Sequence, residues 1–252
     1  MKYIGLDFDG VIVDSVNECL LVGQNSFLEY IDAPNNIDSL NEIPYNELIK
    51  LKYSRKFIRS GEDYVFICMA LNKNHDIKDQ NSFDRFKQKH GNLQPKFYEL
   101  FYKERLSMFK KKRQLWIKLN PFYPGVINFC KSSLSMSNFF IISTKEKRYI
   151  IELLKDKQIE INHNYVFQAT NLKNKQSIIN DLLKLHQIKP NEFIFVDDHI
   201  DTLKSVKYTG VQCFLANWGY NSFHQERVAI QNKIPVLSLS EFCKTNLSIN
   251  TN

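Results

Sequence analysis

The stretch Asp7-Phe8-Asp9-Gly10-Val11, which follows the apolar run Tyr3-Ile4-Gly5-Leu6, carries the strongest structural signal in the chain. Residues 3–8 have the length and bulk of a short buried strand. Two carboxylates then stand two residues apart where that strand should end, and Gly10 allows a sharp turn close to a ligand. Burying such charges is costly unless a partner or a metal is present. The stretch therefore predicts either a ligand site at the carboxyl edge of an α/β sheet or a solvated turn after an edge strand.

The composition is that of an ordinary globular protein, with 252 residues, 43% apolar and 24% charged. This length fits one large domain or two smaller ones. No secretory apolar segment precedes the acids, and no apolar run approaches the ~20 residues that span a bilayer. The five cysteines are scattered and form no CxxC pair, so we expect a reduced, cytoplasmic protein without a disulfide framework or structural zinc.

A formal net charge of +7 is moderate. The basic run Lys110-Lys111-Lys112-Arg113 invites comparison with nucleic-acid-binding segments. It continues a helical apolar pattern that includes Phe97, Leu100 and Phe101, so a solvated helix end is the favoured interpretation. We expect neither a nucleic acid nor a membrane as partner, and the sequence leaves open whether the protein is a monomer or a dimer.

Two parts of the chain differ in their periodicity. From residue 16 to residue 119, apolar residues recur at helical spacing. After Pro121 the pattern changes, and compact apolar runs typical of buried strands appear at residues 139–142, 165–167, 193–196 and 211–214. Because these runs alternate with helical segments, we predict an α/β fold with a parallel sheet. Its core would comprise residues 1–15 and 120–252, with the helical block 16–119 inserted after the first strand.

Polar side chains follow several of the predicted strands at the point where each one ends. They are Asp7 and Asp9, then Ser143 and Thr144, then Asp197 and Asp198 with Asp201 close behind, and Lys175 at the start of a helix. In a parallel sheet all these ends lie on one edge. Clustered carboxylates repel one another unless a hard cation neutralises them, and oxygen ligands of this kind suit Mg²⁺.

These motifs resemble those of the haloacid dehalogenase superfamily, the phosphohydrolases with an aspartate nucleophile. The matching segments are Asp7-Phe8-Asp9-Gly10-Val11, Ile142-Ser143-Thr144-Lys145, Lys175 and Phe195-Val196-Asp197-Asp198. Tyr123-Pro124-Gly125-Val126 and Trp218-Gly219-Tyr220 are similar to segments of the helical-cap subgroup, which includes phosphoglycolate phosphatases and β-phosphoglucomutase. The resemblance covers about 1–15 and 120–225. It implies a Rossmann-like core with residues 16–119 as an inserted α-helical cap.

The resemblance also implies a role for each motif residue. Asp7 would attack phosphorus and form an aspartyl-phosphate, and Asp9 would protonate the leaving oxygen and later activate water. Mg²⁺ would be held by the Asp7 carboxylate, the Asp9 backbone carbonyl and the Asp198 carboxylate. Dehalogenases of this superfamily lack an acid at the position of Asp9, which favours phosphate-ester chemistry.

Phosphate would be bound by the Gly10 amide, by Lys175 and by a hydroxyl. Either Ser143 or Thr144 could supply that hydroxyl, and alignment by the following lysine favours Ser143. Lys173 precedes the same helix and is a rival to Lys175.

Asp197 and Asp201 would lie next to the metal ligands and support them without binding the metal themselves. Family members commonly carry Asn or Asp four residues after the acidic ligand, where this chain has Thr202, so Asp201 is expected to replace it. His199 is more simply a bystander in the loop than a metal ligand.

The inserted block offers one unusual polar patch, Arg55, Lys56 and Arg59. Arg55 or Arg59 could contact a sugar or carboxylate beyond the phosphate, since arginine pairs with such groups in bidentate fashion. The solvent-exposed face of an amphipathic helix would account for the same residues equally well.

The function that we expect is a Mg²⁺-dependent phosphatase acting on a small phosphorylated metabolite, either a sugar phosphate or a phospho-acid. A phosphomutase resembling β-phosphoglucomutase is the enzymatic alternative. A non-catalytic binding member of the fold is the alternative from another class, which the intact Asp7, Asp9, Lys175 and Asp198 disfavour.

Overall fold

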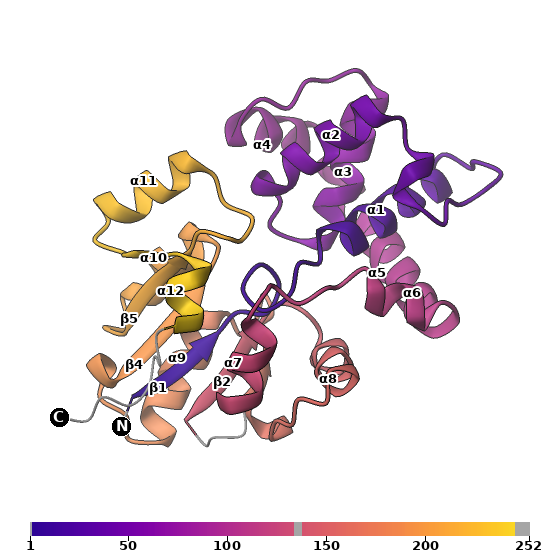
Figure 1. The fold of residues 1–252 in the computed structure, drawn as a ribbon. Helices are drawn as coiled ribbons and strands as arrows, with labels where there is room; N and C mark the ends of the chain where they lie inside the picture. The colour runs from indigo at the N-terminus through magenta and orange to yellow at the C-terminus, as the bar shows by residue number, and fades with distance from the viewer. Residues whose placement is uncertain (1, 134–137, 245–252) are drawn as a thin grey trace. The chain divides into compact units, whose positions relative to one another are not determined.

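The computed structural model describes residues 2–133 and 138–244 (Figure 1). The chain divides into two compact units, Met1–Asp14 with Pro121–Asn252, and Ser15–Asn120. The predicted core extended to residue 252, and residues 245–252 lie outside the described part.

The first unit is built on six strands that form one all-parallel sheet in the order β3-β2-β1-β4-β5-β6. Their bounds are β1 Tyr3–Leu6, β2 Phe139–Ser143, β3 Val166–Gln168, β4 Phe193–Asp197, β5 Gln212–Ala216 and β6 Val236–Leu237. The predicted α/β fold with a parallel sheet is confirmed. Strand β1 lies in the middle, with Leu6 paired to Ile141 of β2 and to Val196 of β4. The carboxyl ends of these three strands therefore meet at one edge of the sheet.

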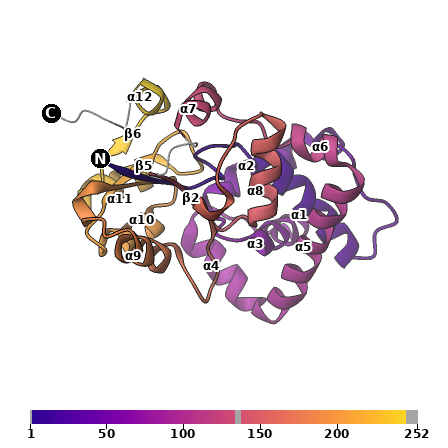
Figure 2. The same cartoon turned by 90° about the horizontal axis from the view of Figure 1, so that it is seen from below.

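Helices cover both faces of this sheet. They are α7 Val126–Ser133, α8 Lys147–Asp156, α9 Lys175–Leu185, α10 Ile200–Lys207, α11 Phe223–Gln231 and α12 Leu239–Lys244. Figure 2 shows α7 and α12 on one face and α9 and α10 on the other. Every residue of β2 and β4 is buried, as expected for the central strands of a sheet covered on both sides. The aromatic rings of Phe140 and Phe193 stack across these strands, with centroids 6.0 Å apart.

The core continues past β1 into a tight turn. The amides of Ile12 and Val13 both donate to the carbonyl of Phe8, so the strand ends before Phe8. The chain leaves the first unit after Asp14 and returns to it at Pro121. These two residues are neighbours, since the amide of Asp14 donates to the carbonyl of Pro121 at 2.8 Å.

The second unit, every residue of which is described, consists of helices without strands. They are α1 Val16–Tyr30, α2 Tyr45–Ser54, α3 Gly61–Asn72, α4 Gln80–Lys89, α5 Gln94–Lys111 and α6 Arg113–Lys118, with 3₁₀ turns at Leu40–Glu42, Arg55–Phe57 and Gly91–Leu93. Phe66 of α3 packs edge-on against Phe97 of α5, with ring centroids 4.7 Å apart. Glu18 of α1 accepts two hydrogen bonds from Arg105 of α5, at 2.9 and 3.0 Å, in the buried interior.

Three further features concern the described part of the chain. The basic run 110–113 is exposed where α5 ends and α6 begins. In residues 2–133 and 138–244, no helix combines the length and the apolar character needed to cross a membrane. All five cysteines fall within these ranges, and each is a free thiol.

Candidate active site

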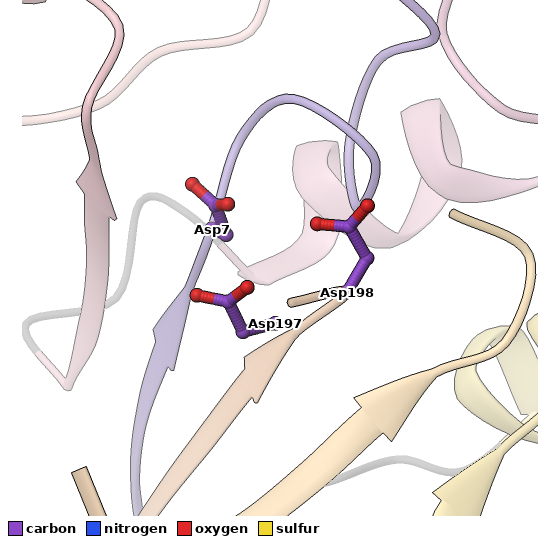
Figure 3. A group of neighbouring side chains, drawn as sticks. All are labelled: Asp7, Asp197 and Asp198. Atoms are coloured by element: carbon purple, nitrogen blue, oxygen red, sulfur yellow. The ribbon is translucent and has the colours of Figure 1, made fainter. Parts of the chain in front are cut away.

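Three buried carboxylates meet at the carboxyl edge of the central strands (Figure 3). Asp7 directly follows β1, Asp197 is the last residue of β4, and Asp198 comes next. One carboxylate oxygen of each lies within 4.8 Å of the others. Asp7 and Asp198 are 7% and 8% exposed and Asp197 is fully buried, so solvent does little to screen their mutual repulsion.

Asp7 is held by contacts on both carboxylate oxygens. The amide of Phe8 donates to Oδ1 at 2.7 Å, and the Lys175 ammonium lies 2.7 Å from Oδ2. Burial raises the pKa of Asp7 to about 6, Lys175 opposes this increase, Asp197 adds to it, and a hydrogen bond with Ser143 lowers it. Asp7 is therefore half-ionised near pH 6 and mostly ionised at neutral pH.

This raised pKa gives a prediction for the protein without bound cations. A carboxyl whose pKa rises from 3.8 to about 6 on folding stabilises the fold fully below pH 3.8. That contribution, about 3 kcal/mol, is lost as the pH rises through 6. With a chelator present, we expect the wild-type melting temperature to fall relative to that of Asp7→Asn between pH 4 and about 7. If the melting temperatures of the two proteins changed equally with pH across this range, the raised pKa of Asp7 would be contradicted.

Lys175 links two of the acids. It is the first residue of α9, preceded by the N-cap Asn174, and its ammonium lies 2.7 Å from Asp7 and 2.8 Å from Asp197. Burial disfavours the charged ammonium, but Asp197 and Asp7 together raise the pKa of Lys175 above its ordinary value. Lys173, the rival from the sequence, is exposed and pairs with Asp181 at 2.6 Å. The structure thus brings Lys175, and not Lys173, to the acidic cluster.

Asp197 is a supporting anion. Its Oδ2 accepts from Lys175, and its Oδ1 accepts from the His199 amide at 2.8 Å. The His199 ring lies 3.5 Å from the hydroxyl of Thr202. Asp201 is exposed in the first turn of α10. Of the two acids expected to support the metal site, Asp197 lies in the cluster and Asp201 lies at the surface.

Two loops, which contain Gly10 and Gly219, approach Asp198 closely. The Tyr220 amide donates to its Oδ2 at 2.7 Å. A Cβ on Gly219 would lie 2.3 Å from the Asp198 Cβ, and a Cβ on Gly10 would lie 2.4 Å from the Asp198 Oδ2. Gly10 also has a φ of +85°, which favours glycine. The Gly10 amide donates to the Val13 carbonyl at 2.9 Å, and its predicted contact with phosphate stays a prediction.

Gly219→Ala is expected to displace Asp198. The added methyl would overlap Asp198 and the Gly10 carbonyl, and we expect a loss of about 1–3 kcal/mol in unfolding free energy. Displacing a group of the site by an ångström reduces turnover on the order of 10²-fold. Phosphate release and thermal melting measure the two effects. Gly91→Ala is the matched control, because nothing lies within 4 Å of its added Cβ. Equal activities of the two variants would contradict the role given to this close contact.

The turn after β2 brings a hydroxyl and a lysine to the site. Ser143 is buried and hydrogen-bonds to Asp7, whereas Thr144 is exposed. The Lys145 ammonium lies 3.0 and 3.4 Å from the two carboxylate oxygens of Asp9. In the sequence Lys145 only aligns the hydroxyl motif, and its pairing with Asp9 was not predicted. A lysine two residues after the hydroxyl was the available signal.

Arg55 and Arg59 belong to the helical unit. Arg55 donates to the carbonyl of Ile58 at 3.3 Å, and its guanidinium lies 5.7 Å from the centre of the Tyr64 ring. Arg59 pairs with Asp84 at 3.1 Å, both side chains being more than two-fifths exposed. Their predicted contact with substrate stays a prediction.

The family model of the haloacid dehalogenase-like hydrolases matches residues 4–216. The chain therefore belongs to this hydrolase family, as the resemblance of its motifs predicted. A comparison with curated proteins found no match.

Solved structures share the fold at low sequence identity. A predicted phosphatase from Clostridium acetobutylicum is 17% identical, with 98% of this chain and 99% of that chain covered and a TM-score of 0.58. A HAD family hydrolase from Deinococcus radiodurans, with bound phosphate and sodium, is 12% identical, with coverage of 98% and 95% and a TM-score of 0.58. A predicted phosphoglycolate phosphatase from Haemophilus somnus is 16% identical, with coverage of 88% and 87% and a TM-score of 0.51.

Proposed function

We propose that this protein is a Mg²⁺-dependent phosphatase of a small phosphorylated metabolite. The observation that carries the proposal is the placement of Asp7 beside Lys175 and Ser143, with Asp198 in the same buried cluster. A nucleophilic carboxylate, an ammonium and a hydroxyl are the groups that phosphoryl transfer through a covalent intermediate requires. The phosphate bound to the similarly folded Deinococcus radiodurans protein agrees with this class of substrate.

The charges of the site fit a divalent cation. Asp7, Asp9, Asp197 and Asp198 bring four carboxyl groups together, and the ammonium groups of Lys145 and Lys175 contact three of them. A cluster rich in carboxylates with an all-oxygen donor set suits Mg²⁺. Asp7 and Asp198, with the Asp9 backbone carbonyl, would hold it, since Asp197 already pairs with Lys175. When bound, Mg²⁺ would neutralise charge on the phosphoryl group.

The chemical steps divide between the two acids that flank Phe8. A carboxylate oxygen of Asp7 attacks phosphorus, the bond to the leaving oxygen breaks, and Asp9 gives that oxygen its proton. Asp9 then takes a proton from water as the water oxygen attacks the phosphorus of the aspartyl-phosphate. This second step releases inorganic phosphate and regenerates Asp7. Lys175 and Ser143 hold the phosphoryl oxygens, with exposed Thr144 as an additional contact from the same turn.

We further propose that residues 16–119 act as a cap that closes over the substrate. The chain passes from one unit to the other at Asp14 and Pro121, which a backbone hydrogen bond joins, and we propose these residues as the hinge. Arg55 and Arg59 are the cap residues that we propose for contact with the substrate beyond its phosphate. A reducing cytoplasm is the proposed setting, in keeping with five free thiols.

Phosphate release from a panel of esters tests this function. The panel contains sugar phosphates, short phospho-acids and an aryl phosphate, each assayed with Mg²⁺ and with a chelator. We expect turnover with Mg²⁺ that falls to the background rate with the chelator and returns when Mg²⁺ is added back. An isomeric sugar phosphate without phosphate release would instead identify a mutase. A folded protein that does neither would contradict the proposal.

A further inference from the structure

We propose that Lys145 is a positioning residue that orients the Asp9 carboxylate toward the leaving oxygen of the substrate. The inference rests on the proposed phosphatase function and adds a residue to it. Asp9 must lie within hydrogen-bonding reach of the leaving oxygen to protonate it, so the orientation of its carboxylate decides how well it serves as the acid.

The contact between Lys145 and Asp9 is suited to fixing an orientation. The ammonium lies 3.0 Å from Oδ1 and 3.4 Å from Oδ2, so both carboxylate oxygens are engaged. An ammonium shared by the two oxygens restricts rotation of the carboxylate about its last torsion. The Lys145 side chain is fully buried, which confines its own motion.

Exposure distinguishes orientation from direct contact with substrate. The Asp9 side chain is 20% exposed, whereas the Lys145 side chain is 0% exposed. A substrate can therefore reach Asp9 without reaching the ammonium behind it. Lys145 acts on the reaction through Asp9 and is not itself a catalytic residue.

The same turn also contacts the nucleophile. The Lys145 amide donates to the Ser143 hydroxyl oxygen at 3.3 Å, and Ser143 lies close enough to Asp7 to lower the pKa of that acid. Residues 143–145 thus place a hydroxyl near Asp7 and an ammonium in contact with Asp9. This turn fixes the two acids relative to each other, as the transfer of phosphoryl group and proton in one step requires.

The dependence on the leaving group tests this role. We compare kcat/KM, which reports phosphoryl transfer to Asp7, for an aryl phosphate and an alkyl phosphate in wild type and Lys145→Met. The alkoxide that leaves from an alkyl phosphate needs the proton from Asp9. The nitrophenolate that leaves from an aryl phosphate such as nitrophenyl phosphate does not. The loss with the alkyl ester is therefore expected to exceed that with the aryl ester by about 10- to 100-fold. Lys155→Met is the matched control, because Lys155 is an exposed lysine of α8, and it should leave both values unchanged.

A double-mutant cycle separates positioning from a general structural effect. In an Asp9→Asn background, Lys145→Met is expected to cause no further loss with the alkyl ester, since the residue it acts through has been replaced. If Lys145→Met does not fold, Lys145→Gln can replace it, since glutamine retains a polar side-chain end. This variant should also lose more kcat/KM with the alkyl ester than with the aryl ester.

The outcomes distinguish this inference from the function on which it rests. Equal losses with both esters, a raised KM with unchanged kcat, or additive losses in the double-mutant cycle would overturn the role of Lys145 while leaving the phosphatase intact. A wild-type protein that hydrolyses neither ester would overturn the proposed function and this inference with it.

Discussion

Asp7→Asn is expected to lower Mg²⁺-dependent phosphate release by at least about 10⁴-fold, the size of loss typical when a nucleophile is removed. The amide has nearly the shape of the carboxylate but cannot attack phosphorus or form an acyl phosphate. It can still lie beside Lys175, which keeps Asp197 as a partner at 2.8 Å. We therefore expect a folded and inactive protein, measured by phosphate release and by thermal melting on one preparation.

Asp181→Asn is the matched control for this substitution. Asp181 is an exposed aspartate of α9 that pairs with Lys173, and it lies outside the acidic cluster. We expect activity within about twofold of wild type, because exposed ion pairs contribute little. Substantial turnover by folded Asp7→Asn would assign the nucleophile to another group.

Lys175→Met is expected to damage both activity and stability. Removing the ammonium leaves Asp7 and Asp197 buried and close together, and breaking a buried pair in this way costs about 3–5 kcal/mol of unfolding free energy. Activity should fall on the order of 10²- to 10³-fold, since a donor to the phosphoryl oxygens is lost. Chemical denaturation and phosphate release measure the two effects.

Two comparison variants make this prediction specific. Lys173→Met removes an exposed lysine two residues away and should change stability by less than about 1 kcal/mol. Lys175→Met with Asp197→Asn should recover part of the lost stability, because the uncompensated charge goes with its partner. The activity should stay low. A Lys175→Met protein as stable as wild type would show that the acids do not depend on this ammonium.

Much of the core and the positions of the acids could be predicted from the sequence, because each signal is local. The apolar run 3–6 followed by Asp7 marks a buried strand that ends in charge, and the order of the later motifs places Ser143, Lys175 and Asp198 on the same edge. The end of β1 was placed two residues late. Phe8 is apolar enough to continue a strand, but its carbonyl accepts hydrogen bonds from three amides of the following turn.

The contacts that could not be predicted depend on distant parts of the chain. Lysine is usually exposed, and the position of Lys145 two residues after Ser143 does not by itself show that its side chain is fully buried or that its partner is Asp9, 136 residues away. The engagement of the Gly10 amide by Val13 depends on the exact path of one turn. The end of β2 distinguishes Ser143 from Thr144 as the hydroxyl near Asp7. Ser143 is the last residue of the strand and is buried, whereas Thr144 lies beyond the strand and is exposed.

The covalent intermediate on Asp7 is the central claim, and chemical trapping tests it most directly. The enzyme is mixed with Mg²⁺ and an aryl phosphate, quenched within the first turnover, reduced with borohydride, and digested for peptide mass spectrometry. An aspartyl-phosphate is reduced to homoserine, so we expect homoserine at position 7 and unchanged aspartate at positions 9, 197 and 198. Samples without substrate should show aspartate at all four positions. Active enzyme that yields no homoserine at position 7, or yields it at another aspartate, would contradict the account.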